Sequence, residues 1–230
     1  MNRILEVCLA GLILVLGSMV ADTAAAQTLQ QGIAVVMAKT QNASPMPEAD
    51  NADAWIVAVT PHGDLYFGLE SVTPEGLLEA MKSRPRNRDQ KLYIKADARA
   101  PWADVQRVLA SGRAVSFEAP VLLTSQPESP APGTIVPPKG LEVLVIPPPG
   151  GAPPIAVQVN SGEPAPALKV NNEAIAPDAL ESRLKQLLEN SREKVVLVKA
   201  DGLVPFAEVV RVIDACRAAG AKAVLATPEL

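Results

Sequence analysis

Two stretches in the C-terminal half have apolar residues spaced as on one face of a helix. The predicted helix at 177–190 has leucines at i, i+4, i+7 and i+8, and the helix at 205–219 has apolar residues at i, i+3, i+4 and i+7. These residues are Leu180, Leu184, Leu187 and Leu188, and then Val209, Val212, Ile213 and Cys216. Because each stripe covers a single face, we expect both helices to pack on one face of a sheet.

Short runs of β-favouring residues alternate with the helices, and the predicted order of elements is ββαβαβ. In the C-terminal half the predicted strands are 155–160, 167–171, 194–200 and 221–227. In the N-terminal half they are 55–60, 65–69, 91–96 and 115–124, with helices at 74–83 and 101–110. The predicted fold class is α+β, with two tandem ββαβαβ domains, each a small mixed sheet with two helices packed on one face.

Local sequence chemistry marks where two of the helices begin and end. Thr73 is a favourable N-cap, Pro74 suits the first helical position, and Glu75 lies near the positive end of the helix dipole. In the last helix, Gly220 is expected to adopt the left-handed conformation that terminates it. We therefore expect a helix to begin at residue 74 and another to end just before residue 220.

A repeated motif indicates an internal duplication. Lys95-Ala96-Asp97 is followed by Pro101-Trp102-Ala103-Asp104-Val105, and Lys199-Ala200-Asp201 by Pro205-Phe206-Ala207-Glu208-Val209, with an offset of 104 residues. A period of this length is far longer than a solenoid repeat, so each copy should be a small domain with its own core.

We divide the chain into an N-terminal segment, two domains and a linker. The regions are 1–26, a first domain at 27–124 with its core at 55–124, a proline-rich linker at 125–138, and a second domain at 139–230 with its core at 155–230. Each core is preceded by an apolar segment, 31–37 or 139–146, and then by a polar or proline-rich spacer. We expect these two segments to be detached strands that can pair elsewhere.

Composition favours folded domains and argues against nucleic acid as a partner. Hydrophobic residues make up 48% of the chain, while aromatic residues make up only 3%, so the cores should be aliphatic. With 21 basic and 25 acidic residues there is no excess of positive charge of the kind that binds a phosphate backbone.

The N-terminal segment has the features of an export signal. Arg3 precedes an apolar run at 7–20, and Ala24-Ala25-Ala26 is a suitable cleavage site before Gln27. Cleavage would leave the protein in the periplasm with Cys216 as its only cysteine, so no intramolecular disulfide is expected. The alternative is an uncleaved anchor in the inner membrane, although the apolar run is shorter than the roughly 20 residues that span a bilayer.

The second copy resembles the periplasmic domain of the ExbD/TolR family of biopolymer transport proteins. The resemblance rests on Asn171-Asn172-Glu173, Val195-x-Leu197-Val198-Lys199-Ala200-Asp201, Pro205-Phe206-x-x-Val209-Val210 and Gly220-Ala221-Lys222, in that order. In addition, Gln31-Gly32-Ile33-Ala34-Val35 resembles the segment after the membrane helix of that family, and Gly140-Leu141-Glu142-Val143 resembles a second version of it. The resemblance covers nearly the whole mature chain, twice.

This resemblance implies a function in proton-motive-force-driven transport. It implies an ExbB/TolQ-like channel protein or a TonB/TolA-like protein as partner, or alternatively peptidoglycan binding. Family members also carry an aspartate in a membrane helix, but here Glu6 lies at the beginning of the apolar run and Asp22 beyond its end. Because an intramembrane carboxylate is usually functional, its absence predicts that this chain does not itself relay protons.

Family domains of this kind are expected to dimerise and to bind partners by adding strands at sheet edges. Two fused copies could form an intrachain pseudo-dimer, with a homodimer as the alternative. The candidate partner-binding residues in the two detached segments are Gly32, Ile33, Val35, Gly140, Leu141 and Val143.

The repeated motif supplies the other candidates, which are Lys95, Asp97, Lys199 and Asp201. The simpler interpretation is that each Asp accepts backbone hydrogen bonds in a turn while each Lys lies at an exposed strand end. The functional interpretation is a polar patch that contacts a partner or cell-wall glycan.

No catalytic, cofactor or metal site is predicted, so the chain is not expected to be an enzyme. It has one histidine, His62, and a single cysteine after cleavage, too few for a metal cluster of these residues. Gly150-Gly151 lies in a proline-rich spacer and does not lead into a helix, so it is no phosphate-binding loop.

Overall fold

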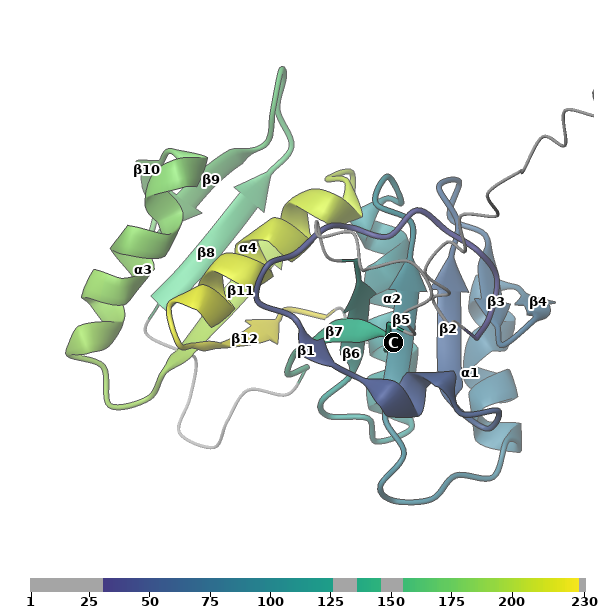
Figure 1. The fold of residues 1–230 in the computed structure, drawn as a ribbon. Helices are drawn as coiled ribbons and strands as arrows, with labels where there is room; N and C mark the ends of the chain where they lie inside the picture. Colours follow the sequence, from purple (N-terminus) through teal and green to yellow (C-terminus); the bar gives the residue numbers. More distant parts are fainter. Residues whose placement is uncertain (1–30, 126–135, 146–154, 228–230) are drawn as a thin grey trace, which may run out of the picture.

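The computed structural model describes residues 31–125, 136–145 and 155–227. In this part of the chain the protein is α+β, with a seven-stranded sheet, a five-stranded sheet and four α-helices (Figure 1). The predicted fold class is confirmed. The predicted signal segment, the linker and the Gly150-Gly151 spacer lie wholly or largely outside the described residues.

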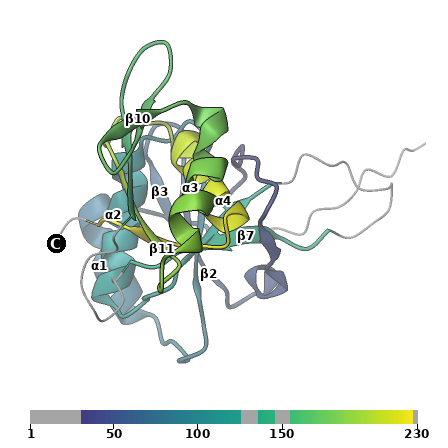
Figure 2. The same cartoon turned by 90° about the vertical axis from the view of Figure 1, so that its left-hand side faces the viewer.

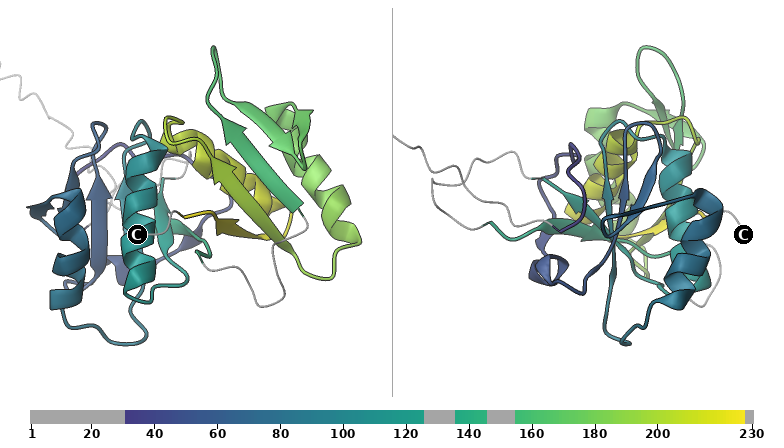
Figure 3. Two further views of the ribbon diagram at one scale, coloured as in Figure 1. Left: turned by 180° about the vertical axis from the view of Figure 1, so that it is seen from behind. Right: turned by 90° about the vertical axis from the view of Figure 1, so that its right-hand side faces the viewer.

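The first copy forms most of the larger sheet. Its elements are β2 (Trp55–Val59), β3 (Leu65–Phe67), β4 (Glu70–Val72), α1 (Pro74–Ser83), β5 (Leu92–Ala96), α2 (Trp102–Ala114) and β6 (Val121–Thr124). The strand order is β6-β5-β2-β3-β4, in which β2 pairs in parallel with β5 and antiparallel with β3. The helices α1 and α2 lie on one face of this sheet (Figure 3).

The second copy has the same order of elements and the same pattern of pairing. Its elements are β8 (Ile155–Asn160), β9 (Ala167–Val170), β10 (Glu173–Ile175), the 3-10 turn η2 (Pro177–Ala179), α3 (Leu180–Glu189), β11 (Val195–Ala200), α4 (Phe206–Ala218) and β12 (Lys222–Leu225). The strand order β12-β11-β8-β9-β10 matches that of the first copy, with β8 parallel to β11 and antiparallel to β9.

The helices form where the apolar spacing places them. In α3 the side chains of Leu180, Leu184 and Leu188 are buried, and in α4 those of Val209, Val212, Ile213 and Cys216 are buried. Leu187, the fourth predicted stripe residue of α3, is half-buried. Burial of three or four such side chains contributes roughly 5–10 kcal/mol per helix before conformational entropy is subtracted. The Thr73 Oγ1 atom accepts a hydrogen bond from Gly76 N at 3.0 Å, which confirms the predicted N-cap.

Two strands were not predicted, and several predicted boundaries are wrong. The strands β4 and β10 were not predicted because each has only three residues and follows a tight turn, at Gly68 with φ 65° and at Asn171 and Asn172 with φ 50° and 72°. The strand predicted at 115–124 begins only at Val121, because α2 continues to Ala114 and Ser116 then turns the chain with φ 68°.

Two further segments join the first sheet. We call residues 31–54 the strap; it contains β1 (Ser44–Pro45) and the 3-10 turn η1 (Pro47–Asp50). The strand β7 (Lys139–Glu142) pairs with β6 on one side and with β1 on the other. The sequence assigns 139–146 to the beginning of the second domain, but β7 is hydrogen-bonded into the first sheet. The strand β7 thus pairs with the first copy although it directly precedes the second copy along the chain.

The two copies contact each other through reciprocal backbone hydrogen bonds beside Pro101 and Pro205, which themselves form an antiparallel bridge. Trp102 N donates to Val204 O, and Phe206 N donates to Ala100 O. Ala103 N donates to Gly202 O, and Ala207 N donates to Ala98 O. Each of these bonds is 2.9 Å long. Equivalent positions of the two copies thus exchange bonds, which is the arrangement of a two-fold symmetric interface.

Candidate partner-binding surfaces

The strap covers the face of the first sheet that lies opposite α1 and α2 (Figure 2). Its buried side chains Met46 and Ala49 pack in a cluster with Ile56, Tyr93, Val121 and Leu123 from the sheet. The strands β2, β5 and β6 are consequently buried on both faces. The strap also reaches the second copy, because Asp214 of α4 accepts hydrogen bonds from Gln41 N at 3.0 Å and Asn42 N at 2.9 Å.

The candidates Gly32, Ile33 and Val35 lie in the strap and are half-buried. The strand predicted at 31–37 does not form; only Met37 makes an isolated bridge, with Asp97. Gly32 has φ 78°, and a Cβ atom there would lie 3.3 Å from Cγ2 of Ile56, so this position requires glycine. Residues 31–36 therefore form no regular strand, and Gly32 lies against Ile56 on the covered face of the sheet.

Asp97 is buried and fixes the strap to the turn after β5. Its Oδ2 atom accepts a hydrogen bond from Val36 N at 3.1 Å, while Ala98 N donates to Val36 O at 2.7 Å. Arg99 donates to Asp97 Oδ1 from its backbone N at 3.0 Å and from Nε at 2.9 Å. The hydrogen bond from the Arg99 side chain is the main cause that holds the pKa of Asp97 below its ordinary value of 3.8.

Lys95 is 2% exposed, which contradicts the prediction that it lies at an exposed strand end. The strap covers it, and Lys95 Nζ donates to Gln31 O at 3.1 Å. Burial lowers the pKa of Lys95, and the nearby carboxylate of Asp50 partly opposes that shift. Burial likewise raises the pKa of Asp50, against the attraction of Lys95.

The second motif lies in a different environment from the first. Lys199 and Asp201 are both exposed. Asp201 Oδ2 accepts hydrogen bonds from Ser161 N at 2.9 Å and Ser161 Oγ at 3.2 Å, so it holds a turn as expected. The two motifs therefore do not combine into one polar patch, because the strap removes Lys95 from the surface.

The candidates Gly140, Leu141 and Val143 lie between the two copies. Gly140 pairs with Leu123 of β6 and Ser44 of β1, and the side chains of Leu141 and Val143 are buried. One residue further, Leu144 N donates to Ala223 O at 2.9 Å and Leu144 O accepts from Leu225 N at 2.7 Å. This segment connects the first sheet to β12, so its backbone groups already have partners within the chain.

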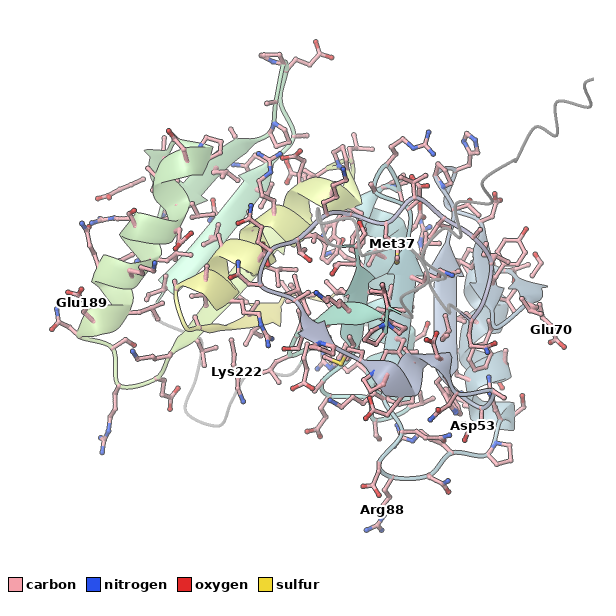
Figure 4. All side chains as sticks on the ribbon, viewed as in Figure 1. Met37, Asp53, Glu70, Arg88, Glu189 and Lys222 are labelled. Atoms are coloured by element: carbon pink, nitrogen blue, oxygen red, sulfur yellow. The ribbon has the colours of Figure 1, made fainter. Side chains whose placement is uncertain are left out.

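The outer edges of the two sheets are β4 and β10. Figure 4 labels Glu70 of β4 at the outer end of the first copy. In both strands the first two residues are exposed and the third is half-buried. Sequence reasoning missed these edges, although each is a short extended run directly before a proline-initiated helix or turn.

In the described residues no group of three or more histidine, cysteine or acidic side chains could hold a metal ion. His62 is exposed, and burial raises the pKa of the Cys216 thiol to about 12. Across the same ranges of the chain, no helix is sufficiently long and apolar to cross a membrane.

A comparison with protein families finds one match that covers most of the chain. The model of the family described as biopolymer transport protein ExbD/TolR matches residues 12–127 and 149–229. No curated protein matches the chain.

Proposed function

The chain belongs to the ExbD/TolR family, and on that basis we propose that it is a non-catalytic periplasmic module that binds protein partners by strand pairing at its sheet edges. The family takes part in biopolymer transport driven by the proton-motive force, and its members are membrane-anchored accessory proteins with a periplasmic domain. What we propose for this chain is the class of its partner and the way in which it binds that partner.

The unpaired outer edges β4 and β10 carry this proposal. A peptide that adds to a sheet edge gains backbone hydrogen bonds, and its alternate side chains supply selectivity. The strand β7 already occupies the edge of β6, and Leu144 bridges to β12. Glu70 and Glu173 at the outer edges are charged, which opposes edge-to-edge aggregation of the free protein. An ExbB/TolQ-like channel protein or a TonB/TolA-like protein is the partner that family membership favours.

The reciprocal bonds beside Pro101 and Pro205 support a pseudo-dimer within one chain. In this arrangement the interface between the two copies of the motif lies within one chain. The free edges β4 and β10 lie on the far sides of the two copies, away from each other (Figure 1). A purified chain should sediment as a monomer. A dimer whose copies exchange partners between chains would contradict this part of the proposal.

Peptidoglycan binding through the loop after α1, which carries Arg84, Arg86 and Arg88, has less support. Arg84 lies over the rings of Trp55 and Phe67 at 5.4 Å and 5.1 Å, and Arg86 lies over Phe117 at 4.2 Å. Both guanidinium groups thus help to close the core, and Arg88 remains exposed.

Photo-crosslinking in cells tests the edge proposal directly. A benzophenone amino acid at Ser71 or Ala174, both exposed on the outer edge strands, should crosslink to a channel-type or TonB/TolA-like protein identified by mass spectrometry. The matched controls are Glu79 and Glu181, exposed on α1 and α3. Crosslinks from the helix positions alone would refute edge pairing.

A further inference from the structure

The second sheet has one face that the described residues leave open. Burial alternates along β8, β9 and β11, so every second side chain enters the core beneath α3 and α4. The remaining side chains lie on the opposite face of the sheet, and this face, away from α3 and α4, is turned toward the viewer in the left panel of Figure 3. Along them Ala156, Gln158 and Leu197 are half-buried and Lys199 is exposed.

Two lysines lie in one row across this open face. The register pairs Gln158 with Lys169 of β9 on one side and with Lys199 of β11 on the other. Adjacent strands are about 4.8 Å apart, so both ammonium groups can reach one bound segment. Neither lysine forms an ion pair with any residue of 155–227 or the other described ranges.

The first copy shows what kind of segment such a face holds. Lys95 occupies the position of Lys199 in the duplicated motif, and the strap brings the Gln31 carbonyl and the Asp50 carboxylate to it. The strap also packs Met46 and Ala49 onto the apolar part of the face. The occupant is thus an acidic stretch with small and apolar side chains that includes the 3-10 turn η1.

The equivalent apolar positions persist in the second copy, with smaller side chains. By strand register, Ala156 corresponds to Ile56 and Leu197 to Tyr93. The half-buried Ala156 and Leu197 form a shallow floor beside the lysine row, without a strap to cover it within the described residues. Within the described residues, the chain therefore carries two versions of one surface, of which the strap covers the first and the second is open.

We propose that the open face of β8, β9 and β11 binds an acidic segment of a partner protein, with its carboxylates at Lys169 and Lys199 and its apolar side chains on Leu197 and Ala156. This surface is a sheet face in the second copy only, so it is independent of the edge pairing proposed above. Loss of either site would leave the other intact.

The test uses a fluorescein-labelled peptide with the sequence of strap residues 41–54, which contains Glu48, Asp50 and Asp53. Fluorescence anisotropy with the full chain should show saturable binding that weakens with added salt. A neutral peptide with Glu48→Gln, Asp50→Asn and Asp53→Asn should bind about tenfold more weakly. Equal binding of the two peptides, or no binding of either one, would overturn the proposal.

Charge-reversal variants locate the site. Lys169→Glu with Lys199→Glu should weaken binding of the acidic peptide about tenfold, whereas Arg192→Glu with Lys194→Glu, in the exposed loop before β11, should change it by less than about twofold. A peptide with Glu48→Lys, Asp50→Lys and Asp53→Lys should in turn bind the first variant, which shows that this variant is folded. Equal loss from both variants contradicts the proposal.

The same variants distinguish other occupants. If the full chain dimerises and Lys169→Glu with Lys199→Glu abolishes the dimer, a second copy covers the face and the proposal fails. If that variant instead loses cosedimentation with purified cell wall while its peptide binding is unchanged, glycan is the ligand and the proposal also fails.

Discussion

Trp102 and Phe206 stack across the boundary between the two copies, with ring centroids 6.4 Å apart and planes 9° from parallel. They occupy equivalent positions of the duplicated motif, and both are buried. Each follows a proline that begins a helix, so the reciprocal backbone bonds and the ring stack form one interface. The duplication therefore placed the same aromatic position on both sides of a local two-fold axis.

Truncation of this stack should destabilise the whole chain. Phe206→Ala removes a buried aromatic side chain and leaves a cavity, which costs about 3–5 kcal/mol. Leu203→Ala, three residues earlier, changes a side chain that is 83% exposed and should stay within about 0.5 kcal/mol of wild type. Urea unfolding measures both variants. A small effect of Phe206→Ala would mean that the copies do not pack on each other in solution.

Asp97→Asn should destabilise the protein by about 1–2 kcal/mol at neutral pH. This value is near the lower limit for a hydrogen bond to a charged group, because the Arg99 side chain that donates to Asp97 is exposed to solvent. Asp201→Asn, at the exposed equivalent position, should cost less than about 1 kcal/mol. Unfolding free energies of the two variants at pH 7 provide the comparison. Equal losses would contradict the burial of Asp97.

The contribution of Asp97 should also depend on pH in a defined direction. Its folded-state pKa is lowered, so below pH 3.8 the unfolded state binds more protons than the folded state. The stabilisation is therefore complete above pH 3.8 and is lost as the pH falls through the folded-state pKa. The difference between wild type and Asp97→Asn should shrink in acid, and a constant difference would refute this assignment.

Charge reversal at the two motif lysines should have unequal effects. Lys95→Glu places a second carboxylate near Asp50 beneath the strap and should cost about 3–5 kcal/mol. Lys199→Glu changes an exposed side chain and should cost less than about 0.5 kcal/mol. Hydrogen exchange should show loss of protection at Ala98, whose amide bonds to Val36 O in the strap, in the first variant only.

Gly140→Ala should loosen the connection between the copies. A Cβ atom at this position would lie 2.4 Å from Val121 Cγ1 and 2.9 Å from Leu122 O, so β7 must shift, at a cost of about 1–3 kcal/mol. Hydrogen exchange at Leu144 and Leu225 should become faster. Gly76→Ala is the control, since its close contact is the Thr73 hydroxyl at 3.0 Å and alanine favours the helix.

The first strands of the two copies, β2 and β8, differ in how apolar their residues are. In the first copy, Trp55–Val59 and Leu92–Ala96 are almost wholly apolar, as expected for strands covered on both faces. In the second copy, Ile155–Asn160 carries polar residues at Gln158 and Asn160, whereas Val195–Ala200 is as apolar as Leu92–Ala96. The sequence difference is thus confined to the strand equivalent to β2, and it does not identify the covering segment.

The sequence by itself determined the order of elements apart from β4 and β10, together with the helix stripes, the N-cap at Thr73 and the family. These features depend on interactions between residues close in the chain, or on a motif repeated at a constant offset. Only the tertiary structure decided that β7 joins the first sheet, that the strap buries Lys95 while Lys199 stays exposed, and that β4 and β10 form the free edges. Identical Lys-Ala-Asp sequences acquire different environments because the strap, with Gln31 64 residues before Lys95 and Asp50 close to Lys95 in space, covers the first motif and not the second.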